Sequence, residues 1–157
     1  MVKISKIKTM IELADKLELE NVEILHKYTP KELTYIYNGI GPDSFPDCLR
    51  QFINLLNPTL EVTAFIHDVE WHESDKTEAT FKASNERLTR NGIVLAKHKY
   101  SWFNPIRYKV ILQAKKFGKL CQMFGFDAWQ SDCTCKVCQK TREQEVKKAK
   151  KQCKQKS

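Results

Sequence analysis

The stretch Ala64-Phe65-Ile66-His67-Asp68-Val69-Glu70-Trp71-His72 places a titratable pair, His67-Asp68, inside an otherwise apolar run. Apolar residues recur at helical spacing on two sides of residues 59–72. One side carries Leu60, Ala64, His67 and Trp71, and the other carries Val62, Phe65 and Val69. Because a helix that is apolar on several sides is buried, the sequence predicts a helix in the middle of the domain that carries His67 and Asp68.

The flanking segments predict further helices. Thr29-Pro30-Lys31-Glu32 combines a capping hydroxyl, a proline at the first helical position and a glutamate three residues after the cap, which together mark a helix start. The pair Asn91-Gly92 predicts a left-handed helix stop. We expect helices over residues 2–27, from 30 to before 38, and over 45–56, 59–72, 75–91 and 105–124, with residues 93–96 open between strand and helix. No alternating segment is long enough to demand a sheet, so the predicted fold class is mainly α.

Length and composition predict one domain with a tail. The chain has 157 residues, of which 41% are hydrophobic, and this is enough to build a core. The predicted division is an N-terminal helical extension over residues 1–28, a central domain over 29–130 and a flexible Cys/Lys-rich tail over 131–157. No apolar run approaches the ~20 residues that span a membrane. The first residues lack the apolar segment of a signal peptide, so we expect a cytoplasmic or virion-packaged protein.

The net charge of +8 is unevenly distributed. Residues 139–157 hold eight Lys/Arg against two Glu, or +6, which leaves about +2 for the other 138 residues. The basic character is therefore expected mainly in the tail. Such a tail suits anionic surfaces, either phospholipid headgroups or nucleic acid.

The cysteines are concentrated in the last quarter of the chain. Four of the six are Cys133, Cys135, Cys138 and Cys153, and this distribution favours a reducing compartment over a disulfide framework. Two interpretations stay open for the close group of three. It is a zinc site completed by Cys153 or Cys121, or a set of free thiols in a flexible tail.

A glycine-bearing turn, Tyr37-Asn38-Gly39-Ile40-Gly41-Pro42-Asp43, precedes the His67-Asp68 helix. Gly39 and Gly41 let the backbone turn tightly and point carbonyl oxygens inward. Carbonyl oxygens together with a carboxylate such as Asp68 are the ligands that Ca²⁺ prefers. His67 points about 100° away on the same helix, where it can act as a base on a water beside the cation.

The order of these motifs resembles the phospholipase A2 superfamily, particularly its bacterial and phage branch. In that family a Cys-Asn-Gly-Cys-Gly-type calcium loop precedes a helix with His-Asp-x-x-Tyr, a following helix carries a distal Asp, and a late Phe-Gly-x-x-x-Trp-like segment closes the domain. The matching stretches here are 38–42, 67–71, the helix over 75–91, and Phe124-Gly125-Phe126-Asp127-Ala128-Trp129.

The resemblance covers about residues 35–130. It implies a helical core with two central helices and Ca²⁺-dependent hydrolysis of the sn-2 ester of a glycerophospholipid at a membrane surface. It also implies His67 as the base and Asp68, Asn38, Gly39 and Gly41 as the metal site.

The chain departs from the family pattern at three places. Tyr37 and Ile40 stand where the family has loop cysteines, and Trp71 stands where it has tyrosine. The family's distal acid aligns with Thr80, and the nearest carboxylate is Glu78, which lies about 200° away round a helix. As the carboxylate nearest to that position in the sequence, Glu78 is the catalytic candidate for orienting His67. Helix capping together with Asp75 is the alternative role for Glu78.

Two other classes of function compete with this interpretation. The segment 64–69 also resembles the core motif of all-helical, metal-dependent phosphohydrolases of the His…His-Asp…Asp kind, for which His26 and Asp127 are the convenient partners. The other class is a non-enzymatic module whose basic tail docks on nucleic acid or a phage particle. Convergence of His26 and Asp127 on His67 would favour the phosphohydrolase.

Overall fold

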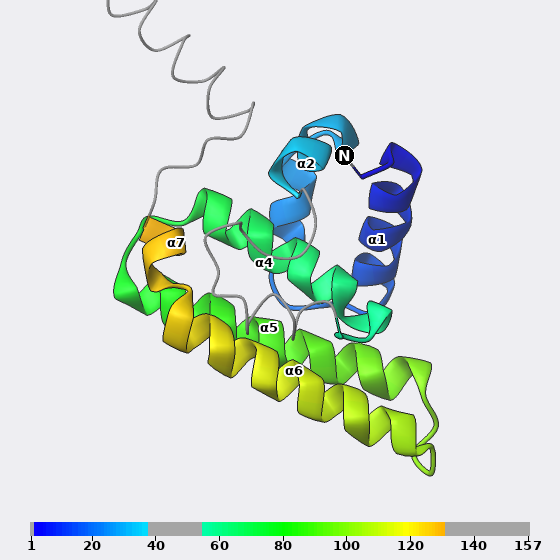
Figure 1. Ribbon diagram of the computed structural model, residues 1–157. Helices are drawn as coiled ribbons and strands as arrows, with labels where there is room; N and C mark the ends of the chain where they lie inside the picture. The colour runs from blue at the N-terminus through cyan, green and yellow to red at the C-terminus, as the bar shows by residue number, and fades with distance from the viewer. Residues whose placement is uncertain (1, 38–54, 131–157) are drawn as a thin grey trace, which may run out of the picture.

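The computed structural model describes residues 2–37 and 55–130, and within these two ranges the chain is helical with no strand (Figure 1). In chain order the elements are α1 (Ile4–Lys16), the 3₁₀ helix η1 (Val22–Lys27), α2 (Pro30–Ile36), the 3₁₀ helix η2 (Pro58–Leu60), α4 (Glu61–Glu73), α5 (Glu78–Lys99), α6 (Pro105–Phe124) and α7 (Phe126–Gln130). The mainly α fold class is confirmed. The described helices include none that is long and apolar enough to cross a membrane.

The N-terminal segment is two short elements rather than the single helix predicted over residues 2–27. Helix α1 ends at Lys16 with Leu17 as its C-cap, and the backbone then adopts left-handed conformations at Glu18 (φ 48°) and Asn21 (φ 63°) before η1 begins. A left-handed residue interrupts the helical hydrogen-bond ladder, which apolar spacing alone does not reveal. The predicted cap of α2 is confirmed, because Thr29 and Glu32 bond each other's backbone N–H groups in a capping box.

Helix α5 differs from its prediction at both ends. It begins at Glu78 because the hydroxyl of Thr77 accepts the N–H of Thr80, whereas Asp75 lies before the helix and accepts from the side chains of both threonines. It continues to Lys99 through Gly92, so the predicted stop at Asn91-Gly92 is wrong. A Cβ on Gly92 would lie 2.7 Å from the Cβ of Ala114, so this glycine allows close helix packing.

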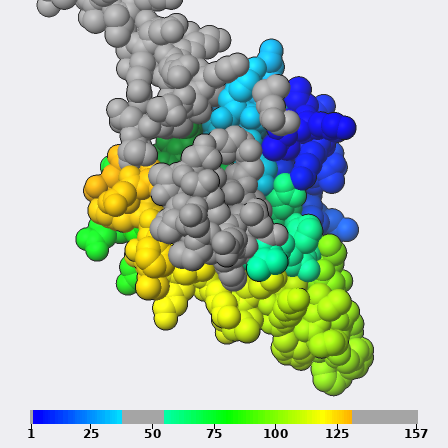
Figure 2. Space-filling view, viewed as in Figure 1, coloured from blue at the N-terminus to red at the C-terminus, as the bar shows by residue number. Residues whose placement is uncertain are grey.

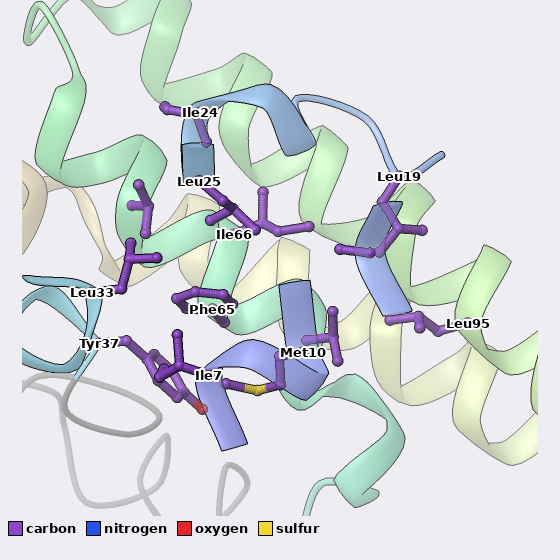
Figure 3. Packing of buried hydrophobic residues seen from close by; sticks show 13 residues of the cluster. Ile7, Met10, Leu19, Ile24, Leu25, Leu33, Tyr37, Phe65, Ile66 and Leu95 are labelled. Carbon is purple, nitrogen blue, oxygen red and sulfur yellow. The ribbon is translucent and has the colours of Figure 1, made fainter. Parts of the chain in front are cut away.

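Helix α4 lies between two clusters of buried apolar side chains. The first cluster joins α1, η1 and α2 to α4, and Figure 3 shows Phe65 and Ile66 among its members. The second cluster joins Leu60 and Ala64 to α5 and α6. All but one of the residues from Val62 to Glu70 on α4 are buried, which confirms the predicted central position of this helix.

Helices α5 and α6 lie side by side and form a long hairpin (Figure 1). Asn104 caps α6 by accepting the N–H of Ile106, and Pro105 occupies the first helical turn as predicted. Helix α6 ends at Phe124 with Gly125 as its C-cap, and the short helix α7 then carries Trp129, which is 1% exposed, back to the core.

The N-terminal segment is joined to α5 by polar contacts as well as by the first cluster. The Glu20 backbone N–H donates to Asn91 Oδ1 at 2.9 Å, and Asn91 Nδ2 donates to the Glu20 carbonyl at 3.1 Å. The guanidinium of Arg90 makes two bonds to the Glu20 carboxylate, at 2.7 and 2.8 Å. Residues 4–27 therefore pack on the same core as the segment that follows them.

Candidate functional site

His67 lies near the middle of α4 with 4% of its surface exposed. Its Nε2 atom lies 2.9 Å from Oδ1 of Asn85 on α5. The indole of Trp71, one turn later on α4, packs against the imidazole with ring centroids 4.5 Å apart. The imidazole is thus held by one hydrogen bond and one aromatic contact.

A hydrogen-bond chain fixes the tautomer of His67. Asn85 Nδ2 donates to Oε1 of Gln122 on α6 at 3.1 Å, so the amide oxygen of Asn85 is the atom that faces His67. An amide oxygen only accepts, and therefore Nε2 of His67 carries the proton. The unprotonated Nδ1 atom is the basic atom of this imidazole.

The surroundings of His67 favour its neutral form. Burial lowers the pKa of His67 to about 4, the hydrogen bond that His67 donates to Asn85 opposes this, and the positive charge of Arg87 adds to the lowering. At neutral pH the imidazole is a free base. Because Asn85 is neutral, it orients the ring but stabilises an imidazolium ion less than a carboxylate would.

Asp68 follows His67 on α4 and points to a different side of the helix. Burial raises the pKa of the Asp68 carboxyl well above its ordinary value. Its charge also contributes to raising the pKa of two buried neighbours, after burial itself: the Tyr37 phenol at the end of α2 and the Cys121 thiol on α6. Asp68 itself is half-buried on α4, and its charge acts on groups at the end of α2 and on α6.

Trp71 uses the polar edge of its ring where the resembled family has tyrosine. Its indole Nε1–H donates to Ser84 Oγ at 3.0 Å. A Cβ on Gly125 would lie 2.6 Å from the Trp71 ring, so the glycine after α6 makes room for the indole. Ser84 and Asn85 are neighbours on α5, so one turn of that helix supports both Trp71 and His67.

Glu78, the carboxylate selected from the sequence, does not hold His67. It is exposed in the first turn of α5, and the Nε2 atom of His67 is bonded to Asn85 instead. Asn85 lies seven residues further along, which is about 10 Å along the helix axis. The sequence prediction missed Asn85 because the family resemblance implies an acid at this place, and Asn85 carries a neutral amide.

The metal-site residues are only partly described. Asn38, Gly39 and Gly41 lie outside the described residues, and so do Cys133, Cys135, Cys138 and Cys153. Residues 2–37 and 55–130 contain no group of three His, Cys, Asp or Glu side chains arranged for a metal ion. The carboxylate of Asp68 is one oxygen ligand of the kind that Ca²⁺ prefers. The other oxygen ligands expected from the sequence are in residues 38–43.

The partners required by the phosphohydrolase alternative are not brought to His67. His26 is exposed on η1, where its Nε2 atom lies 2.9 Å from Asp15 Oδ1. Asp127 is exposed in the first turn of α7. These placements disfavour the alternative, because its chemistry needs both residues beside His67-Asp68.

Comparison of the chain with models of protein families, with curated proteins and with solved structures finds no match.

We expect replacement of Asn85 by aspartate to raise the pKa of His67 from about 4 by about 2, because an anion in hydrogen-bond contact stabilises the imidazolium ion. NMR titration of the imidazole protons measures this value directly. Asn91→Asp is the matched control, since Asn91 is equally buried on α5 but bonds the backbone of Glu20. An unchanged His67 pKa in Asn85→Asp would contradict the contact.

Proposed function

We propose that this protein is a phospholipase A2-like hydrolase in which His67 is the general base and Asp68 a ligand of Ca²⁺. The observation that carries the proposal is the His67–Asn85 hydrogen bond, which leaves the Nδ1 lone pair of a neutral imidazole free to take a proton. The adjacent Asp68 supplies a carboxylate on the same helix. The order of the glycine turn, the His-Asp helix and the following helix in the sequence supports the same function.

The residues of this chain would act as follows. Nδ1 of His67 removes a proton from a water molecule, and the water oxygen attacks the ester carbonyl carbon of the lipid. The proton on Nδ1 then passes to the leaving alkoxide, which restores the neutral imidazole. Throughout, Asn85 accepts the Nε2–H and keeps the ring in the tautomer with a basic Nδ1. Ca²⁺, when held by Asp68 and the 38–43 carbonyls, supplies polarisation of the ester carbonyl.

The neutral side chain of Asn85 determines how fast we expect ester hydrolysis to be. A carboxylate at this position would stabilise the positive charge that His67 gains as it takes the proton, and an amide oxygen stabilises it less. We therefore expect slow hydrolysis, with the Asn85→Asp variant faster than wild type if its fold is kept.

The test is fatty-acid release from mixed phospholipid vesicles with Ca²⁺ or with a chelator. Replacing His67 by alanine is expected to lower the Ca²⁺-dependent rate at least about a hundredfold, because it removes the base. His26→Ala is the matched control, since His26 is exposed on η1 and should leave the rate unchanged. Release that is equal with chelator, or equal in the His67 variant, would overturn the proposal.

A further inference from the structure

The connection between α5 and α6 carries large apolar side chains that face solvent. Trp102 is 64% exposed and Phe103 is 69% exposed. Ile106 and Tyr108, in the first turn of α6, are also exposed, at 44% and 58%. We call these four residues the hairpin tip. Burying such side chains is favourable, so their joint exposure indicates an interaction surface that contacts apolar groups of a partner.

The hairpin tip is held in shape by contacts of its own. The phenol of Tyr108 donates to the Trp102 carbonyl at 2.8 Å, and the Trp102 and Phe103 rings lie 4.3 Å apart. Figure 2 shows the yellow-green end of the α5–α6 hairpin projecting beyond the other helices on this face. The tip can therefore insert into an apolar environment without any change in the packing around α4.

Basic residues flank the hairpin tip in the sequence. Residues 87–126 contain nine Lys/Arg and no Asp or Glu. Those nearest the tip in the chain are Lys97, Lys99, Arg107 and Lys109. The hairpin over residues 78–124 holds ten Lys/Arg against two Glu, or +8. The near-neutral total of residues 1–138 therefore combines a strongly basic hairpin with a net negative charge on the other residues of that range.

We propose that the hairpin tip is a docking site for an anionic lipid bilayer. Trp102 and Phe103 enter the headgroup–acyl boundary, where aromatic rings are favoured, and the surrounding cations contact anionic headgroups. The proposal goes beyond hydrolysis, because it rests on the tip and not on His67.

Two features favour a bilayer over other occupants. Single-stranded nucleic acid would use basic residues and aromatic faces, but the Trp102–Phe103 contact already covers part of both rings, and the aliphatic Ile106 offers nothing for a base to stack on. A second copy of the tip would bring two strongly basic hairpins together, which their charges oppose. A bilayer accepts aromatic and aliphatic side chains and attracts the cations.

The test uses the full chain and the fluorescence of its three tryptophans. Trp129 is buried and Trp71 is half-buried, so exposed Trp102 reports on the tip. Vesicles with about 30% phosphatidylserine are expected to shift the emission to the blue, while pure phosphatidylcholine has a much smaller effect. The double variant Trp102→Ser/Phe103→Ser is expected to bind the anionic vesicles at least tenfold more weakly in a flotation assay.

The controls separate this site from the others in the chain. His67→Ala should bind as wild type does, so failed hydrolysis and failed docking are distinguishable results. Unchanged vesicle binding by the double tip variant would overturn the proposal and assign binding to another part of the chain, such as the basic tail. A blue shift with a single-stranded oligonucleotide but not with anionic vesicles would also overturn it, as would a shift that accompanies self-association in sedimentation.

Discussion

Replacing Arg87 by methionine is expected to lower the free energy of unfolding by about 3 kcal/mol near neutral pH. Arg87 Nε donates to Glu70 Oε1 at 2.5 Å, and the Glu70 side chain is 3% exposed. Asn21 Nδ2 also donates to this oxygen, at 2.6 Å. Without Arg87, a buried carboxylate keeps a single neutral donor among the described residues. Urea denaturation followed by circular dichroism measures the loss.

Arg90→Met is the matched control, because Arg90 is one turn away on α5 and its partner, Glu20, is 44% exposed. An exposed pair contributes less, so we expect a loss below about 1 kcal/mol. Adding Glu70→Gln to Arg87→Met should recover much of the stability, since the amide carries no charge. Burial raises the pKa of Glu70, so the loss should also shrink at mildly acidic pH. Equal losses for the two arginine variants would contradict a buried-charge effect.

Acidification is expected to remove roughly 3 kcal/mol of stability through His67 alone. Its pKa is about 4 in the folded protein against an ordinary value of 6.5, mainly because of burial. The unfolded chain therefore takes up this proton first as the pH falls. The stabilising contribution is complete above the ordinary value of 6.5 and is lost progressively as the pH falls to about 4.

The comparison with His67→Gln isolates this effect, because a glutamine amide can donate to Asn85 Oδ1 without titrating. The difference in unfolding free energy between wild type and this variant should shrink by roughly 3 kcal/mol from about pH 7 to pH 4. The raised pKa of Asp68 acts in the opposite direction, since that carboxyl group favours low pH, but it is present in both proteins. A difference that stays constant with pH would mean that His67 titrates normally.

Local sequence signals predicted several elements correctly. The capping box at Thr29 and Glu32, the start of α6 at Pro105 and the buried α4 each follow from residues within one or two turns. The prediction failed at Gly92, because helix C-termini and close helix contacts both select glycine. Only the position of Ala114 on the facing helix shows which of the two applies.

The candidate site was also predicted in part from local sequence and decided in part by tertiary packing. The sequence alone predicted that His67-Asp68 lies on a buried helix, and the family resemblance implied that an orienting partner comes from the next helix. It could not identify that partner, because hydrogen-bond contact depends on the rotation of α5 against α4, and this rotation is set by packing. The tertiary structure placed Asn85 rather than Glu78 at Nε2. It also brought Trp102 and Phe103 to the projecting end of a basic hairpin, because their exposure depends on how far α5 and α6 extend beyond the core.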